Sequence, residues 1–368
     1  MREQRKELNF EGQNIYIGID VHKKEWTVCI FSEHMEHKKF SQPPSADALQ
    51  SYLHRHFPGA NYYSAYEAGF CGFHVHTKLE SVGINNIVVN AADVPTTHKE
   101  KSNKTDKRDS RKLARSLRAG ELECIHIPTR KTQEDRSLLR TRYAVRKDLT
   151  RIKLRIKSLL NFYGIEHPEQ FSTPGKHWSK RYMEWLKTLP MEQESGRAVL
   201  QTLISEAEEM RKVQLAVTKE VRVLSKTESY SKNFELLNGI PGISVITGMC
   251  FLTEIDDINR FSSTNHLASY VGLVPSCHGT GEKENNGFIT SRAHKLMRDM
   301  IVESAWITAA KDPALHLAFC KLCKRMEQNK AIIRIARKLL NRIENNKCAA
   351  LRLFELKKEN VADKLFKR

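Results

Sequence analysis

The chain lacks a long apolar run and is poor in acidic residues relative to basic ones. In 368 residues, no stretch approaches the ~20 apolar residues that a membrane-spanning helix needs. Residues 1–14 are charged and have no apolar core, so no secretory signal is expected there. The 43 Asp and Glu residues face 61 Lys and Arg residues, a formal net charge of +18. This excess favours a polyanionic partner, because basic proteins bind nucleic acid by neutralising its phosphates. A charge that only aids solubility is the alternative.

The eight cysteines lack the spacing of a disulfide or zinc framework. Cys320 and Cys323 form one C-x-x-C pair, and no second pair accompanies them. We therefore expect reduced thiols and a cytoplasmic location.

The hydrophobic pattern divides the chain into three predicted domains. In residues 1–128, short β-rich runs alternate with helical patterns, which is typical of an α/β sheet domain. In residues 129–232, two heptad seams predict a long antiparallel coiled-coil helical hairpin, which could pack on itself or pair with another protomer. Residues 233–368 are predicted to be mostly α-helical and to end in a basic amphipathic helix. Specific predictions in the first domain are strands at 15–19, 27–31, 62–66, 86–90 and 122–127, and helices at 46–56 and 73–81.

Four acidic residues of the first domain form a candidate metal site. Asp20 and Glu67 each end a predicted strand, while Asp106 and Asp109 lie three apart on one face of a predicted helix. Carboxylates that converge repel one another unless a cation neutralises them, and oxygen ligands suit Mg²⁺, with Mn²⁺ as an alternative. A solvated helix face with local ion pairs is the other interpretation of the Asp106–Asp109 pair.

Several motifs together resemble the DEDD insertion-sequence transposases of the IS-one-ten type, which are bridge-RNA-guided DNA recombinases. The motifs are IYIGIDVHKK, AYEAGFCGF, KTDKRDSRKLA, NGIPGIS, ASYVGLVPS and ITSRAHKLMRDMIVESAW. The resemblance implies a RuvC-like (RNase H-like) N-terminal domain, a coiled coil and a C-terminal transposase domain. It also implies that Asp20, Glu67, Asp106 and Asp109 bind Mg²⁺, in a composite site with a nucleophilic serine from another subunit.

The expected nucleophile is the one departure from the family pattern. In GLVPSCHGTGEK, the position of the family serine holds Thr280, followed by Gly281. Compared with serine, the extra methyl group of Thr280 crowds an in-line attack and restricts the side-chain rotamer. Three interpretations stay open: Thr280 is the nucleophile, Ser276 has replaced it, or the protein is weakly active or inactive.

The resemblance implies a transposase that acts on donor and target DNA, binds a structured guide RNA and forms a dimer or tetramer in a bacterial cytoplasm, associated with the nucleoid during transposition. The alternatives are a Mg²⁺-dependent junction resolvase that activates water, and an RNA- or DNA-binding protein with little catalysis. The glycine-rich turn at Gly242 resembles a phosphate-binding helix-hairpin-helix, although an ordinary helix–helix turn explains it equally well. The residues expected to contact nucleic acid are Lys104, Lys107, Arg108, Arg111, Lys112, Gly242, Lys283, Arg292, Arg298, Arg334, Arg337 and Lys338.

Overall fold

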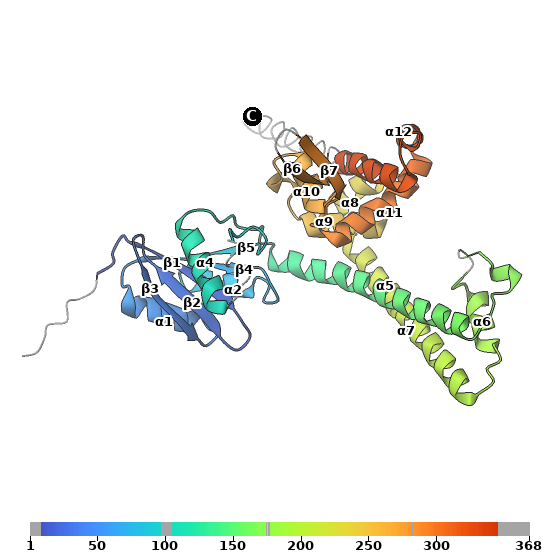
Figure 1. Cartoon of the computed structure of the whole chain (residues 1–368), viewed down its shortest axis with the longest axis horizontal. Coiled ribbons are helices and arrows are strands. Elements are labelled where there is room, and N and C mark those ends of the chain that lie inside the picture. The colour runs from blue at the N-terminus through green and yellow to red at the C-terminus, as the bar shows by residue number, and fades with distance from the viewer. Residues whose placement is uncertain (1–8, 97–104, 174, 176, 281–282, 345–368) are drawn as a thin grey trace, which may run out of the picture. The chain divides into compact units, whose positions relative to one another are not determined.

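The computed structural model describes residues 9–96, 105–173, 175, 177–280 and 283–344. The chain forms two compact units, one ending at Ile127 and the other beginning at Pro128 (Figure 1). The second unit holds both long central helices and the C-terminal helices. Its further division into a hairpin domain and a transposase domain stays a prediction.

The first unit contains a mixed five-stranded sheet in the order β3-β2-β1-β4-β5. β1 pairs with β2 and β2 with β3 in antiparallel fashion, whereas β1–β4 and β4–β5 are parallel. This mixed α/β arrangement is consistent with the RuvC-like domain that the resemblance implies. The strands are β1 (Asn14–Val21), β2 (Trp26–Phe31), β3 (Glu36–Gln42), β4 (Asn61–Glu67) and β5 (Asn85–Val89).

Helices cover both faces of this sheet. Ile15, Ile17 and Ile19 of β1 pack in one core with α1 (Ala46–His56) and α2 (His74–Ser81). On the other face, α4 (Asp106–Arg118) packs against β1, β2 and β4. Since side chains alternate along a strand, every second residue of β1 points towards α4. This alternation decides where the acidic residues point.

Two features of the sheet differ from the sequence predictions. β3 was not predicted, because its sequence EHKKFSQ is mostly polar and lacks the apolar alternation of a strand. The strand predicted at 122–127 is wrong: these residues have no regular secondary structure. Ile125 N donates to Val88 O at 2.8 Å, but no ladder continues, and Ile125 and Ile127 serve instead as apolar packing against the core.

Two long helices pack side by side in the second unit and run in opposite directions. Leu160 near the end of α5 shares a core with Leu200 near the start of α7, while Leu139 and Val221 share a core at the other end. The antiparallel helix pair is therefore present, and its coiled-coil character stays a prediction. The elements are α5 (Arg130–Phe162), η1 (Glu169–Phe171), α6 (Lys180–Thr188) and α7 (Glu194–Leu224).

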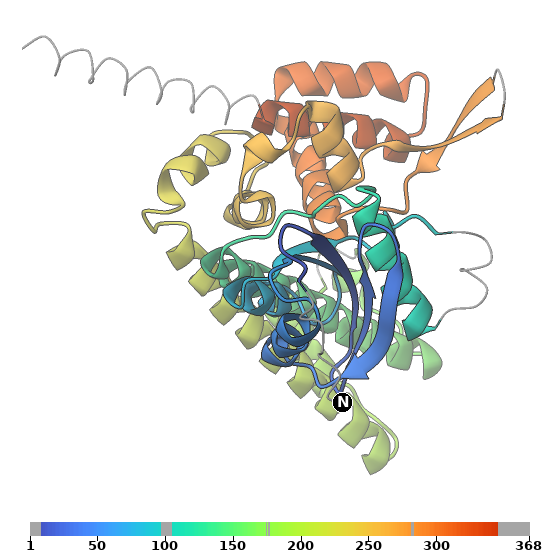
Figure 2. The ribbon, with the colours of Figure 1, turned by 90° about the vertical axis from the view of Figure 1, so that its left-hand side faces the viewer.

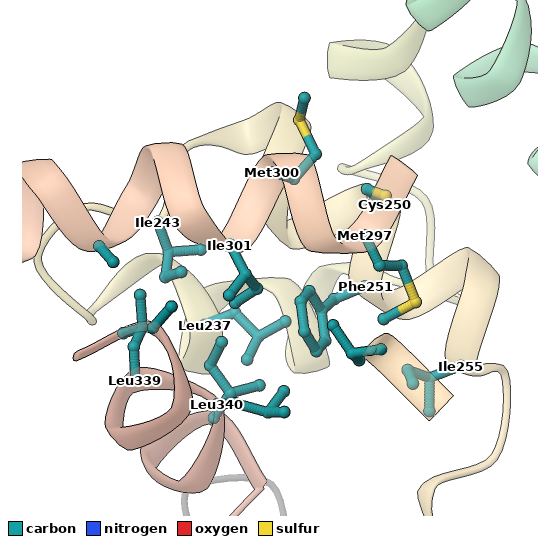
Figure 3. Packing of buried hydrophobic residues seen from close by; sticks show 14 of the residues in the cluster. Leu237, Ile243, Cys250, Phe251, Ile255, Met297, Met300, Ile301, Leu339 and Leu340 are labelled. Carbon is teal, nitrogen blue, oxygen red and sulfur yellow. The ribbon is translucent and has the colours of Figure 1, made fainter. Parts of the chain in front are cut away.

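The C-terminal part of the second unit is a helical cluster from which a two-stranded hairpin projects (Figure 2). Figure 3 shows Phe251, Ile301 and Leu340 meeting in its apolar core from three different helices. The elements are α8 (Ser231–Asn238), α9 (Val245–Ile255), η3 (Ile258–Arg260), α10 (Thr264–Val271), β6 (Pro275–Thr280), β7 (Lys283–Ile289), α11 (Lys295–Lys311) and α12 (Pro313–Cys323), followed by helical residues 328–344.

The last described helix has the two faces predicted from the sequence. Ile335, Leu339 and Ile343 are buried in the core, whereas Arg334 and Lys338 are exposed. Its apolar face is therefore packed, as expected. Across the described residues, no helix is long and apolar enough to cross a membrane.

Candidate active site

The alternation of side chains places Asp20 and Glu67 on the same face of the sheet. Asp20 shares its face of β1 with Tyr16, which packs against α4. Glu67 shares its face of β4 with Tyr63, whose ring stacks on that of Tyr16 at 6.0 Å between centroids. Because β1 and β4 are parallel neighbours, both carboxylates lie at the same edge of the sheet.

Gly18 allows α4 to lie directly on β1. A Cβ atom at Gly18 would lie 2.0 Å from Ser110 O and 2.5 Å from Ala114 N, which is closer than real Cβ contacts come. The first turn of α4 carries Asp106 and Asp109, and acidic side chains there are favoured by the helix dipole. The close backbone contact therefore brings the first turn of α4 to the edge of the sheet where the strand carboxylates lie.

His22 connects one pair of acidic residues, Asp20 and Asp106. Its Nε2 lies 3.3 Å from Asp20 Oδ2 and 3.5 Å from Asp106 Oδ2. One ligand atom from each of these three residues lies within 4.8 Å of the others, a spacing that could hold a metal ion. His22 follows β1 directly and is half-exposed, so the three residues stand at the surface of the first unit.

Lys112 connects a second pair of acidic residues, Glu67 and Asp109. Its Nζ lies 3.4 Å from Glu67 Oε1 and 3.8 Å from Asp109 Oδ1, and its side chain is only 8% exposed. A buried lysine needs carboxylate partners, since an unpaired charge is costly to remove from water. Lys112 is thus part of the carboxylate cluster, and its contact with nucleic acid stays a prediction.

The two pairs are close enough to affect each other's charge. Burial raises the pKa of the Asp20 carboxyl above its ordinary range, and the charges of Asp106 and Asp109 raise it further, against the opposing effect of His22. Several carboxylate oxygens crowded at one edge of a sheet fit a hard divalent cation, which would relieve this repulsion.

The sequence indicated the four acidic residues but missed the side chains between them, His22 and Lys112. Lys112 stands three residues after Asp109, a helical spacing that could have revealed the ion pair. His22 stands two residues after Asp20 in the β1–β2 turn, and no pattern in one sequence separates it from an ordinary turn residue. Only the placement of α4 on β1 shows that it reaches Asp106.

The two candidate nucleophiles lie on β6, in the second unit. Thr280 ends β6 and pairs with Lys283 of β7. Ser276 lies near the start of β6, and its Oγ donates a hydrogen bond to Phe288 O at 3.0 Å. The base of this hairpin is fixed to the helices, because Thr290 O accepts a hydrogen bond from Arg298 Nη1 at 2.7 Å. The side chain of Thr280 is outside the described part of the structure.

The other residues expected to contact nucleic acid fall into three groups. Arg108, Arg111, Arg292, Arg334 and Lys338 are exposed, while Arg298 and Arg337 are half-buried. Of these, Arg111 pairs with Glu36 at 2.7 Å. Lys104 lies outside the described residues, as do the side chains of Lys107 and Lys283.

Gly242 has a packing role in the structure. Its φ is +93°, and a Cβ atom there would lie 2.4 Å from Thr308 Oγ1 and 2.7 Å from Ser304 O. The glycine is therefore required for the close approach of the α8–α9 turn to α11. A phosphate contact at this turn stays a prediction.

The fold and the site define an α/β domain with a surface cluster of carboxylates suited to a divalent cation, joined to a helical unit. Comparison with known families agrees with both parts. Residues 17–165 match the model of the DEDD transposase of the IS110 type, and residues 234–320 match the model described as the transposase IS116/IS110/IS902 family. The chain belongs to the IS110-type DEDD transposases, a family of DNA-recombining enzymes.

Individual relatives carry names of the same kind. A putative transposase, y4qE, of Sinorhizobium fredii is 28% identical over 66% of this chain and 58% of its own length. The transposase for insertion sequence element IS1533 of Leptospira borgpetersenii is 23% identical over 80% of this chain and 85% of its own. The pilin gene-inverting protein of Moraxella bovis is 34% identical over 32% of this chain and 38% of its own.

Proposed function

We propose that this protein cuts and rejoins DNA through a covalent protein–DNA intermediate, with a divalent cation at the carboxylate cluster. The observation that supports the proposal is a set of two carboxylate pairs at one edge of the sheet: Asp20 with Asp106, on either side of His22, and Glu67 with Asp109, on either side of Lys112. Mg²⁺ bound there, or Mn²⁺ in its place, would polarise the scissile phosphate and offset the charge of the pentavalent transition state.

The attacking group in this proposal is the hydroxyl of Thr280. A bond forms between Thr280 Oγ1 and the phosphorus, the hydroxyl gives up its proton, and the bond from phosphorus to one deoxyribose oxygen breaks. That oxygen takes a proton as it leaves. Rejoining reverses the step, with a deoxyribose hydroxyl of another strand attacking the phosphothreonine ester. The energy of the broken phosphodiester is thus kept for strand joining.

A structural observation favours Thr280 over Ser276. The Ser276 hydroxyl already donates a hydrogen bond to Phe288 O across the base of the β6–β7 hairpin. Its use as a nucleophile would break that cross-strand bond. Thr280 stands at the far end of the same strand, where it pairs with Lys283.

We further infer that a structured guide RNA selects the DNA sites and that the active protein is a dimer or tetramer. The formal charge of +18 suits the simultaneous binding of RNA and DNA. The protein would read backbone and helix shape through exposed basic residues such as Arg108, Arg334 and Lys338. Exposed apolar side chains on the antiparallel helix pair, among them Leu154 and Val223, support an oligomer contact.

Covalent trapping tests the proposal. The protein, co-expressed with the RNA encoded beside its gene, is incubated with Mg²⁺ and a nicked suicide DNA carrying the end of its element. We expect a denaturation-resistant protein–DNA adduct with the wild type, with Ser276→Ala and, at altered rate, with Thr280→Ser. We expect none with Thr280→Ala.

Each of the other outcomes would indicate a different nucleophile or a different function. An adduct that persists in Thr280→Ala and disappears in Ser276→Ala would make Ser276 the nucleophile. DNA cleavage with no adduct in any variant would indicate a resolvase that activates water. No cleavage with the RNA present would indicate a nucleic-acid-binding protein without this activity.

A further inference from the structure

A pocket of about 780 Å³ lies between α5, α7, α6 and the segment that precedes α6, all within the second unit. Its apolar wall includes Leu149, Met183 and Leu215. Its other lining side chains include a tryptophan, four cations and one carboxylate: Trp178, Lys153, Lys180, Arg211, Lys212 and Glu208. Pockets of this size hold ligands comparable to a nucleotide.

The tryptophan of this pocket is held in an unusual backbone conformation. Trp178 has φ +67°, a region that bulky residues rarely adopt because it costs free energy. Two contacts hold it there: Arg211 Nη1 donates to Trp178 O at 3.1 Å, and the ring packs edge-on against Tyr182 at 5.3 Å. Backbone strain of this kind concentrates at ligand sites. The indole is therefore fixed at the pocket wall by features that packing alone does not require.

The cations of the pocket are only partly neutralised. Glu208 pairs with Lys187 at 2.6 Å, outside the pocket, and Lys212 pairs with Glu209 at 2.6 Å. Within the part of the chain that the structure describes, no carboxylate forms an ion pair with Lys153 or Arg211. A bound anion would supply the negative charge that the described carboxylates do not give to these two cations.

Lys153 is the central cation of this arrangement. Its Nζ lies 5.1 Å from the centroid of the Trp178 ring. Burial lowers the pKa of Lys153, and the nearby charges of Arg211 and Lys157 lower it further. Like charges that are held together in this way attract a phosphate, which would relieve their repulsion.

We propose that this pocket binds one unpaired nucleotide of a single-stranded nucleic acid, with the base against Trp178 and its phosphate on Lys153 and Arg211. An aromatic ring beside uncompensated cations is the combination by which proteins hold single strands. This site is separate from the carboxylate cluster and needs no divalent cation. The binding proposal can therefore be tested independently of the cleavage mechanism.

The test measures binding of the full chain, in EDTA, to two fluorescein-labelled probes, a uridine decamer and a thymidine decamer. We expect Trp178→Ala to weaken binding about tenfold or more, and Trp178→Phe to retain affinity within about threefold, because phenylalanine can still stack. We expect Lys153→Gln/Arg211→Gln to make the salt dependence shallower, by about 0.7 in the slope of log K against log salt for each phosphate that is no longer neutralised. The probe that shows the larger drop in affinity identifies RNA or DNA as the source of the strand.

The matched control is Arg155→Gln/Lys219→Gln. It removes the same charge from the exposed faces of the same two helices, outside the pocket. It should leave the affinity for both decamers nearly unchanged. Circular dichroism and thermal unfolding check that each variant is folded.

Two results of the binding measurements would overturn the proposal. One is equal affinity of the wild type, Trp178→Ala and Lys153→Gln/Arg211→Gln for both probes. The other is an equal drop in affinity in the pocket variants and the control. In that case the pocket would contribute only non-specific electrostatic attraction. An iodouridine decamer supplies an independent readout, because photocrosslinking to the peptide that contains Trp178 is expected and crosslinking only elsewhere would contradict the site.

Discussion

At the scale of single residues, each carboxylate of the candidate site has a nitrogen-bearing side chain beside it. His22 lies between Asp20 and Asp106, and Lys112 lies between Glu67 and Asp109. The four acidic residues were evident from the sequence, because each ends a strand or begins a helix. His22 and Lys112 were not, because each also has a partner from another element, Asp106 and Glu67 respectively. The charges that need neutralising can thus be read from the sequence, whereas the side chains that approach them follow only from the fold.

One residue-scale prediction separates catalysis from binding. Asp106→Asn removes one negative oxygen ligand and keeps the shape of the side chain. DNA cleavage should fall by at least about a hundredfold, since the charge that would hold the cation is removed. RNA affinity, measured by filter binding, should stay within about twofold, because one carboxylate matters little against a net charge of +18. An equal decrease in affinity and activity would show that Asp106 supports the fold instead.

A second residue-scale prediction concerns a buried carboxylate far along the sequence from the acidic quartet. Glu254 of α9 is fully buried and accepts two hydrogen bonds from Arg140, at 2.8 Å each, and one from His294 at 3.1 Å. Burial alone would raise its pKa, but these hydrogen bonds prevail and lower the pKa of Glu254 to about 2 from the usual 4.5. The ionised form is therefore the one that stabilises the folded state.

The sign of the pH dependence follows from that lowered pKa. The stabilisation by Glu254 is fully present above pH 4.5 and is lost as the pH falls towards about 2, a difference of roughly 3 kcal/mol in the free energy of unfolding. Glu254→Gln should be less stable at pH 7 and should lack this part of the acid dependence in urea titrations. Glu209→Gln, at an exposed ion pair, is the control and should change little. Identical acid dependence of Glu254→Gln and wild type would contradict the assignment.

At the scale of elements, the sequence was most informative where apolar periodicity was strong. The helix predicted at 46–56 has the bounds of α1, and the four apolar strands were found to within two residues. β3 escaped because a polar edge strand has no apolar alternation, and its pairing with β2 decides its structure. The strand prediction at 122–127 was wrong because Ile125 and Ile127 pack against the core, but no neighbouring strand among the described residues pairs with the segment to form a ladder.

An element-scale prediction tests how α4 is positioned. Gly18→Ala would place a Cβ against the backbone of Ser110, so α4 must move away from β1. We expect a decrease of about 1–3 kcal/mol in stability. We also expect cleavage to fall about a hundredfold, because Asp106 and Asp109 move with the helix. Thermal unfolding and a cleavage assay measure the two effects.

The matched control for this prediction is Gly69→Ala. Gly69 follows β4 in the same unit, and a Cβ there would approach only Glu67 O, at 3.9 Å. It should therefore retain both stability and cleavage. Wild-type cleavage by Gly18→Ala would show that the close approach of α4 to β1 does not position the site.

At the scale of the whole molecule, the second unit presents apolar surface that its own core does not use. Leu154 is 60% exposed and Val223 is 54% exposed, although both belong to the long antiparallel helices. If these helices mediate the proposed oligomer, Leu154→Glu should lower the molar mass measured by light scattering and should reduce cleavage. Lys219→Glu changes charge on the same helix pair and should leave the molar mass unchanged. An unchanged mass in Leu154→Glu would place the contact elsewhere.

The proposed function depends most on a divalent cation held jointly by Asp20, Glu67, Asp106 and Asp109. Electron paramagnetic resonance of free Mn²⁺, titrated with the intact protein in the absence of DNA, measures this directly. We predict binding by the wild type that is weakened at least about tenfold in Asp20→Asn and in Asp106→Asn, and that Mg²⁺ competes for the same site. Equal Mn²⁺ binding by the wild type and both variants would contradict the claim.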